Sequence, residues 1–240
     1  ACRGTAGFVH VSCLAEQAKI LYAEAEENNL GDKVLDKRSL RWYHCSLCEQ
    51  DYHGVVRCAL GWACWKTYVG RSEADWARLS AMTQLGNGLD AAEHREDALS
   101  VRETELSMWR RLGASGEIML VVQANLAITY QQLGRLEDAS RMQRDVYSGW
   151  LKLHGKEDDR TLRAANNYGW GLINLRRFGT ARTLLRKMTP VARRTVGDDN
   201  SLTLGMRQNY ALALCDDPAS TLDDLREAVA TLEEIERTAR

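Results

Sequence analysis

Apolar residues in the second half of the chain recur at helical spacing. Between residues 120 and 133 they occupy positions 120, 122, 126, 127, 130 and 133, which is the spacing of an α-helix. The pattern predicts helices over 120–133, 136–153, 162–175 and 178–196. Gly134, Gly155 and Gly197 end the first, second and fourth of these segments, because glycine adopts the positive φ angles that close a helix without strain.

The helical segments belong to a repeat of 42 residues. Glycine recurs at 113, 155 and 197, leucine at 120, 162 and 204, and asparagine at 125, 167 and 209. Alanine follows at 98, 139, 181 and 228, with a short insertion at 216–220 lengthening the last interval. Such a period is typical of repeat architectures, in which helix pairs stack to form one continuous core. We therefore predict an all-α solenoid of about four helix pairs, over residues 79–118, 119–161, 162–203 and 204–240.

The residues of the repeat resemble a known family. Residues 125–139 read Asn-Leu-Ala-x2-Tyr-x2-Leu-Gly-x-Leu-Glu-Asp-Ala, and residues 209–211 read Asn-Tyr-Ala. These segments are similar to tetratricopeptide repeats. The 42-residue period, with a glycine closing each unit, resembles the kinesin-light-chain subtype. The resemblance implies a groove that binds an extended segment of a partner protein.

The first 58 residues are rich in cysteine instead. Two residues separate His10 from Cys13 and Cys45 from Cys48, and seven separate Cys2 from His10. Thiolate and imidazole pairs at such spacing suit tetrahedral zinc. Disulfides are less favoured, because the chain shows no secretory signal. A small cysteine-rich cap without metal is the other alternative.

The order Cys-x7-His-x2-Cys, then Cys-x2-Cys, resembles the last five of the eight ligands of a RING-CH finger, the RING variant of membrane-associated ubiquitin ligases. The resemblance implies that residues 1–58 are a partial finger and that the chain is a window on a longer protein. It implies two zinc ions in the intact finger. His10 and Cys13 would complete one site, and Cys2, Cys45 and Cys48 would belong to the other. It also implies an E2 ubiquitin-conjugating enzyme as a partner.

Two departures from the RING-CH pattern weaken the ligase hypothesis. The gap between Cys13 and Cys45 holds 31 residues, of which Ala18–Glu27 are predicted to form an inserted helix. Gln17 stands where the family has an aromatic side chain that grips the E2. A zinc fold is therefore better supported than a ligase.

Residues 59–78 are predicted to form a helical junction between the finger and the repeats. Its aromatic side chains are expected to pack between these two parts; they are Trp62, Trp65, Tyr68 and Trp76. Cys58, Cys64 and Cys215 are expected to be buried apolar thiols.

Asparagine at one fixed position of three units is the main candidate for partner binding. Asn125, Asn167 and Asn209 lie too deep in the first helix of each unit to be N-caps, and asparagine is a weak helix former there. An amide offers a donor and an acceptor to a peptide backbone, and the matching residue lines the groove in kinesin-light-chain-like repeats. The alternative is an inter-repeat asparagine ladder that fixes helix register. The other candidates are Gln84, in the matching place of the first unit, and Ile128, Trp170, Asn174 and Leu212.

Composition limits the remaining function classes. The chain has 240 residues, 45% hydrophobic and 27% charged, with a net charge of −1, which is ordinary for a soluble globular protein. It lacks the basic excess of a nucleic-acid binder and the apolar run of about 18–20 residues that a membrane helix needs. It shows no nucleophile–base–acid constellation.

We therefore expect a cytoplasmic or nuclear protein-interaction adaptor, the substrate-binding part of a RING-CH-type E3 ubiquitin ligase. The alternative is a non-enzymatic tetratricopeptide scaffold with a structural zinc module. A cargo adaptor of the kinesin-light-chain kind is less favoured, because the sequence contains no heptad coiled coil.

Overall fold

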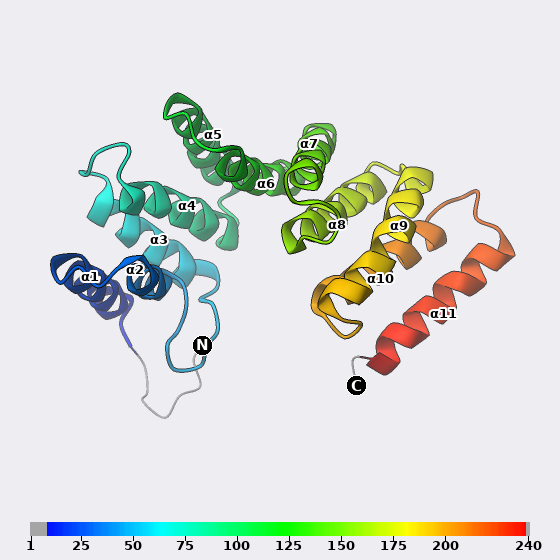
Figure 1. Ribbon diagram of the computed structural model, residues 1–240, viewed down its shortest axis with the longest axis horizontal. Helices are drawn as coiled ribbons and strands as arrows, with labels where there is room; N and C mark the ends of the chain where they lie inside the picture. The colour runs from blue at the N-terminus through cyan, green and yellow to red at the C-terminus, as the bar shows by residue number, and fades with distance from the viewer. Residues whose placement is uncertain (1–8, 239–240) are drawn as a thin grey trace. The chain divides into compact units, whose positions relative to one another are not determined.

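The computed structural model describes residues 9–238, and the chain divides into two compact units between Gly113 and Ala114 (Figure 1). The first unit contains the helices α1 (Val11–Glu27), α2 (Asp32–Ser39), η1 (Leu40–Trp42), α3 (Gly54–Tyr68), α4 (Trp76–Ala91) and α5 (Arg95–Arg111). The second contains α6 (Gly116–Gln132), α7 (Leu136–His154), α8 (Asp159–Asn174), α9 (Phe178–Val196), α10 (Ser201–Cys215) and α11 (Leu222–Thr238). The described residues otherwise hold one isolated antiparallel bridge, between His44 and Asp51.

The helices of the second unit confirm the prediction from the 42-residue period. Helix α9 has its predicted bounds, and α7 ends one residue later than predicted. Helices α6 and α8 begin earlier than predicted because polar side chains cap them. Ser115 accepts a hydrogen bond from the backbone of Ile118, and Asp158 accepts one from Arg160. Such caps satisfy backbone N–H groups that have no partner within the helix.

The turns of the second unit also repeat. Gly155 and Gly197 follow α7 and α9 with φ angles of 79° and 102°. Gly134, with φ 75°, lies between α6 and α7, and Arg176, with φ 57°, takes the equivalent place between α8 and α9. The repeat in the sequence is thus a repeat of backbone conformation, because these positions need the left-handed region that favours glycine.

The core of the second unit lies between its stacked helices. Leu162, Leu185, Met188 and Met206 are fully buried and belong to one cluster, contributed by α8, α9 and α10. Helix α7 packs between α6 and α8, and α9 packs between α8 and α10. Helices α7 and α9, the second helices of their pairs, are therefore each covered on two sides, as in a solenoid.

The first unit is held by aromatic contacts and an ion pair. The Tyr68 ring meets Tyr22 and Trp42 edge to face, with ring centroids 5.5 and 5.9 Å apart. The Arg71 guanidinium donates two hydrogen bonds of 2.6 Å to the Glu26 carboxylate. The paired geometry of an arginine and a carboxylate fixes α1 against the segment between α3 and α4.

Some predictions about the junction are wrong. Tyr68 is buried and Trp65 is half-buried as expected, but Trp62 and Trp76 are 43% and 59% exposed. Trp62 lies on the face of α3 opposite Leu60 and Cys64, whereas Trp76 begins α4 and meets Trp109 at its edge. Cys64 is buried, and burial raises the pKa of its thiol.

The other two predicted buried thiols are less covered than expected. Cys58 is half-buried, and its pKa is also raised by burial. Cys215, at the end of α10, is exposed.

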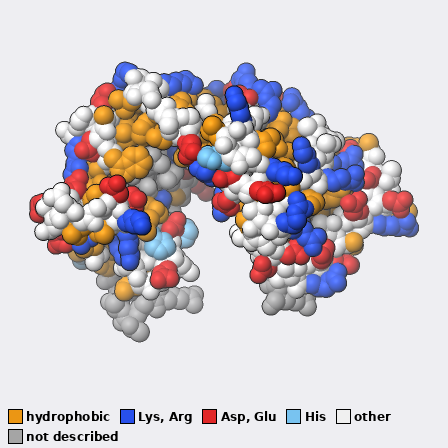
Figure 2. Space-filling model, in the orientation of Figure 1, with side chains coloured by type: hydrophobic (Ala, Val, Ile, Leu, Met, Phe, Trp, Pro, Cys, Tyr) orange, Lys and Arg blue, Asp and Glu red, His pale blue; other side chains and the backbone are white. Residues whose placement is uncertain are grey.

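Charges of both signs are spread over the surface. On the face drawn in Figure 2, Lys and Arg side chains alternate with Asp and Glu side chains over each unit. None of the helices within residues 9–238 is both long and apolar enough to cross a membrane.

Candidate peptide-binding groove

A hollow of about 200 Å³ lies in the second unit, where α6, α7 and α8 meet. Its lining residues are Val121, Ala124, Asn125, Ile128, Gln143, Val146, Trp150, Arg160, Arg163, Ala164 and Asn167. We call it the α6–α8 groove. Val121 and Ile128 are 48% and 41% exposed on α6, so an apolar ligand would bury them.

The floor of the groove is apolar and rigid. Val146, Trp150 and Ala164 are 2%, 4% and 6% exposed and belong to one core cluster with Leu120. Because a buried tryptophan in a packed cluster cannot change rotamer freely, the floor is formed before any ligand binds. A preformed apolar floor with a few polar groups is typical of binding sites.

Two arginines form one side of the groove. The Arg160 guanidinium lies 4.6 Å from the centre of the Trp150 ring, a cation–π contact. It also donates to Asp158 at 3.1 Å and to Glu117 at 3.0 Å. The hydrogen bond to Asp158 is the main cause of the raised pKa of Arg160. Arg163 donates to Asp159 at 2.6 Å, so both cations are already balanced by carboxylates.

The structure brings two of the predicted asparagines to this groove. Asn125 and Asn167 both line it, from equivalent positions of α6 and α8. Both are half-buried, and within the described residues neither side-chain amide makes a hydrogen bond. Two amides with their hydrogen-bonding capacity available, beside an apolar floor, suit a ligand that carries backbone amides.

The third asparagine is placed differently. The Asn209 amide donates to Asn166 Oδ1 at 2.9 Å, across α8 and α10, and does not line the groove. This bond joins the first helices of two neighbouring repeats, which is the role expected of a contact that fixes helix register. Its partner, however, is Asn166 and not the repeat-related Asn167.

Of the other predicted groove residues, Ile128 lines the hollow from α6. Its lining does not include Gln84, Trp170, Asn174 or Leu212. Gln84 is in the first unit, where its Oε1 accepts a hydrogen bond of 3.2 Å from Arg57. Trp170 is 37% exposed and Asn174 is half-buried on α8. They lie three and seven residues after Asn167, so helical spacing places them on the same face of α8, beyond the lining of the hollow.

Gln143 was missed by the sequence analysis and lies under the groove. It is 4% exposed, and its Nε2 donates to Gln131 Oε1 at 2.8 Å. Its Oε1 lies against Gly171, where a Cβ would be 2.0 Å away. The 42-residue repeat predicts that position 143 is a core position, because the equivalent residue of the next repeat is the fully buried Leu185. A polar residue at a core position of one unit is a local inconsistency that often marks a site.

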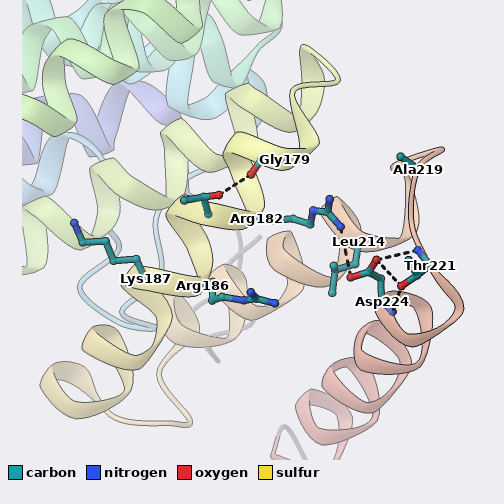
Figure 3. Close-up of a pocket in the computed structure, with 9 residues that line it drawn as sticks. Gly179, Arg182, Arg186, Lys187, Leu214, Ala219, Thr221 and Asp224 are labelled. Carbon is teal, nitrogen blue, oxygen red and sulfur yellow. Dashed lines mark hydrogen bonds and ion pairs between the residues drawn. The ribbon is translucent and has the colours of Figure 1, made fainter.

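A larger hollow, of about 660 Å³, lies between α9 and the start of α11 (Figure 3). Arg182 reaches from α9 to Asp217 at 3.1 Å and to Asp224 at 3.6 Å. Hydrogen bonds from Thr221 are the main cause of the lowered pKa of Asp224. Arg182, Asp217, Thr221 and Asp224 are thus paired with one another. This network stabilises the packing of α11 against α9, and it needs no ligand to balance its charges.

Four of the five predicted zinc ligands lie within the described residues, in two pairs that are separate along the chain. Cys45 precedes a tight turn over residues 46–48, which ends with Cys48. Glu49 follows with a φ of 54° and donates its backbone N–H to the Cys45 carbonyl oxygen at 3.0 Å. Cys45 also donates its N–H to Gln50 at 2.9 Å. Cys45 is buried and Cys48 half-buried. A turn with two thiols at x2 spacing fits half of a tetrahedral metal site.

His10 and Cys13 form the second pair, at the start of α1. His10 is the N-cap residue of this helix and is exposed, as is Cys13. Cys2 lies outside the described residues. Among residues 9–238, no three His, Cys, Asp or Glu side chains are grouped closely enough to hold a metal ion. The described residues thus supply pairs of donors and not a complete site.

Comparison with known proteins agrees with the helical repeat. A family model described as tetratricopeptide repeat matches residues 118–194. No curated protein matches the sequence. The structure is similar to a Podosopora anserina kinesin light chain with nearly identical tetratricopeptide-like repeats (Q17M form), with a TM-score of 0.62 and 17% identity over 97% of each chain.

Two further solved structures are similar over most of this chain. BtubC (BKLC) from P. vanneervenii has a TM-score of 0.65 at 13% identity, covering 96% of this chain and 91% of that one. The apo form of RapI has a TM-score of 0.57 at 12% identity, covering 97% and 73%. The fold is therefore an all-helical, tetratricopeptide-like solenoid.

Proposed function

We propose that this chain is a protein-interaction scaffold that binds an extended segment of a partner protein in the α6–α8 groove. The observation that carries the proposal is the placement of Asn125 and Asn167, which line one hollow from repeat-related positions. Their amides can pair with the N–H and C=O groups of a peptide backbone. The apolar floor under them would bury one bulky side chain of the peptide.

A selected peptide tests this function directly. A library of displayed peptides is panned on the intact chain, and the affinity of the best binder is measured by calorimetry. Changing Asn125 and Asn167 together to Ala should weaken binding about tenfold or more, since two hydrogen bonds of about 1 kcal/mol each are lost. The unfolding temperature should change little, because neither amide bonds another side chain in the folded chain.

Asn209→Ala is the matched control. It removes the same side chain from the equivalent helix position, but outside the groove. We expect a modest loss of stability, because Asn166 loses its partner, and unchanged peptide affinity. Equal loss of binding in both variants, or binders that are indifferent to Asn125 and Asn167, would contradict the proposal.

We infer further that the intact N-terminal module binds zinc and that the protein acts as a RING-CH-type E3 ubiquitin ligase. The resemblance of the cysteine and histidine order supports this, and so does the turn that carries Cys45 and Cys48. Zinc would be held by Cys2, Cys45 and Cys48 in one site and by His10 and Cys13 in the other, each completed by ligands of the intact finger. The metal would fold the module, and an E2 enzyme would be brought to the captured partner.

Zinc content and auto-ubiquitination separate the ligase from a plain scaffold. Protein containing the intact finger should hold zinc by mass spectrometry and modify itself with ubiquitin when supplied with a panel of E2 enzymes. Cys45→Ser should abolish both. Normal zinc content without activity for any E2 would favour the alternative, a scaffold with a structural zinc module. Loss of neither property would refute the zinc assignment.

A further inference from the structure

A hollow of about 470 Å³ lies in the first unit, where α1, α2 and the start of α4 meet. We call it the α1–α2 hollow. Its lining includes four carboxylates, from Glu26, Asp32, Asp36 and Asp75, and two aromatic rings, from Tyr22 and Trp76. None of the described residues that line it is basic. The hollow is therefore a patch of negative charge in a chain whose net charge is only −1.

Only part of this negative charge is balanced within the unit. The Arg71 guanidinium pairs with Glu26 at 2.6 Å and lies 3.5 Å from Asp75. Asp32 and Asp36 lie one turn apart on α2, are exposed, and form no ion pair with a described residue. Neither lysine of α2 lines the hollow. Like charges four residues apart destabilise a helix, so a cation bound beside both carboxylates would relieve their repulsion.

Tyr22 is an independent sign that the hollow takes a ligand. It is 6% exposed, and its hydroxyl makes no hydrogen bond to any described residue. Burial and then the Glu26 carboxylate raise the pKa of Tyr22, and Asp75 and Asp36 act in the same direction. Because these three carboxylates all line the hollow, the hydroxyl points into it. A buried hydroxyl without a partner is costly, and a ligand that donates a hydrogen bond to it would remove that cost.

Trp76 supplies an aromatic face beside the carboxylates. It is the first residue of α4 and is 59% exposed, and it meets Trp109 edge to face with ring centroids 6.5 Å apart. Asp75, directly before it, caps α4 by accepting a hydrogen bond of 2.9 Å from the backbone N–H of Ala77. The cap fixes the start of the helix, and with it the place of the indole. The face of an indole ring attracts a cation.

The arrangement of the carboxylates favours an organic cation over a metal ion. Within residues 9–238, no three acidic, His or Cys side chains are grouped closely enough to hold a metal. A guanidinium is planar and carries donors on three nitrogens, so it can bond separate acceptors while it stacks on an aromatic ring. We propose that the α1–α2 hollow binds an arginine side chain of a partner protein. This site belongs to the first unit and is independent of the α6–α8 groove.

Peptide titrations test the chemistry of the occupant. The peptide acetyl-Gly-Ser-Arg-Ser-Gly-amide is titrated into the isotope-labelled intact chain. The backbone amides of α2 and the indole N–H of Trp76 are followed by NMR. The same peptide with lysine should bind about threefold to fivefold more weakly, because an ammonium stacks less well on the indole. The peptide with citrulline, which has nearly the shape of arginine without its charge, should bind at least about tenfold more weakly.

Variants test the named residues. Asp32→Asn combined with Asp36→Asn should weaken binding of the arginine peptide about fivefold, given the size of two exposed ion pairs. Trp76→Leu should remove the preference for arginine over lysine. Tyr22→Phe should also weaken binding about fivefold, because one hydrogen bond is lost. Its unfolding temperature should not fall, because the hydroxyl has no partner in the free chain. A purely structural hydroxyl would lower that temperature and leave the affinity unchanged.

Glu96→Gln combined with Asp97→Asn is the matched control. It removes the same two charges from the first turn of α5, and neither residue lines the hollow. We expect unchanged affinity. Weaker binding confined to the hollow variants, with arginine preferred to lysine, would support the site. Equal weakening in the control would show general charge attraction and overturn the proposal. A citrulline peptide that binds like the arginine peptide would overturn it too, as would resonances of the hollow that do not respond to arginine.

Discussion

The two units use glycine in different ways. In the first unit a Cβ on Gly61 would lie 2.7 Å from the backbone oxygen of Gln84, and one on Gly88 would lie 2.8 Å from that of Arg57. In the second unit a Cβ on Gly169 would lie 2.9 Å from Leu185 Cδ2. Glycine thus allows the backbones of α3 and α4 to pack in direct contact. Between α8 and α9 it makes room for a side chain of the neighbouring helix. A side chain can move aside, whereas a helix backbone can move only with its whole helix.

Gly88→Ala should give the largest effect. The added methyl group would also lie 2.9 Å from the Cα of Cys58, so α3 and α4 must separate. We expect a loss of about 2–3 kcal/mol in the free energy of unfolding, after the better helix propensity of alanine is included. Hydrogen exchange should show faster exchange in α3 and α4 and no change in α8 to α10. Uniform loss of protection in both units would contradict the difference between them.

Gly169→Ala should cost less. Its new methyl group meets the Leu185 side chain, which can shift slightly without moving a helix backbone. We expect a loss of about 1 kcal/mol, measured by chemical denaturation. If this loss equals that of Gly88→Ala, the distinction between backbone and side-chain neighbours is wrong.

The sequence predicts these two units unequally. In the second unit the 42-residue period predicts the order of the helices and the equivalence of Ala139, Ala181 and Ala228, and the largest differences from the prediction are the capped starts of α6 and α8. The close approaches at Gly61 and Gly88 have no such signal in the sequence. They join segments with no common period and depend on how α3 crosses α4. The groove was predicted in part for the same reason. Asn125 and Asn167 repeat in sequence, whereas Trp150 enters the floor from α7 and stands where the next unit has Ala192.

Acidic side chains also differ between the units. In the first unit burial raises the pKa of Glu105, which is 0% exposed, accepts a hydrogen bond from Thr83 and lies 3.9 Å from Arg102. In the second unit hydrogen bonds from arginine lower the pKa of half-buried carboxylates, chiefly from Arg135 at Asp138 and from Arg160 at Asp158. Burial thus raises the pKa of one carboxyl in the first unit, whereas hydrogen bonds from arginine lower the pKa of two carboxyls in the second.

Glu105→Gln should change the pH dependence of the first unit. Because the pKa of Glu105 is higher in the folded chain than in the unfolded chain, its contribution to stability is complete below the unfolded pKa. That contribution is lost as the pH rises through the folded pKa. The variant cannot titrate, so its stability relative to the natural chain should increase as the pH rises. Denaturation at several pH values measures this, and a pH-independent difference would contradict it.

Gly179→Ala should give the smallest effect, and of the opposite sign. Gly179 lies in the first turn of α9, at a negative φ, and a Cβ there would meet no atom within 4 Å. Alanine restricts the unfolded chain more than glycine does, so the variant should be more stable by about 0.5 kcal/mol. The three alanine substitutions then form a series in which only the neighbour of the new methyl group differs: backbone, side chain or open space. A destabilised Gly179→Ala would mean that glycine in this solenoid is needed for a reason other than packing space.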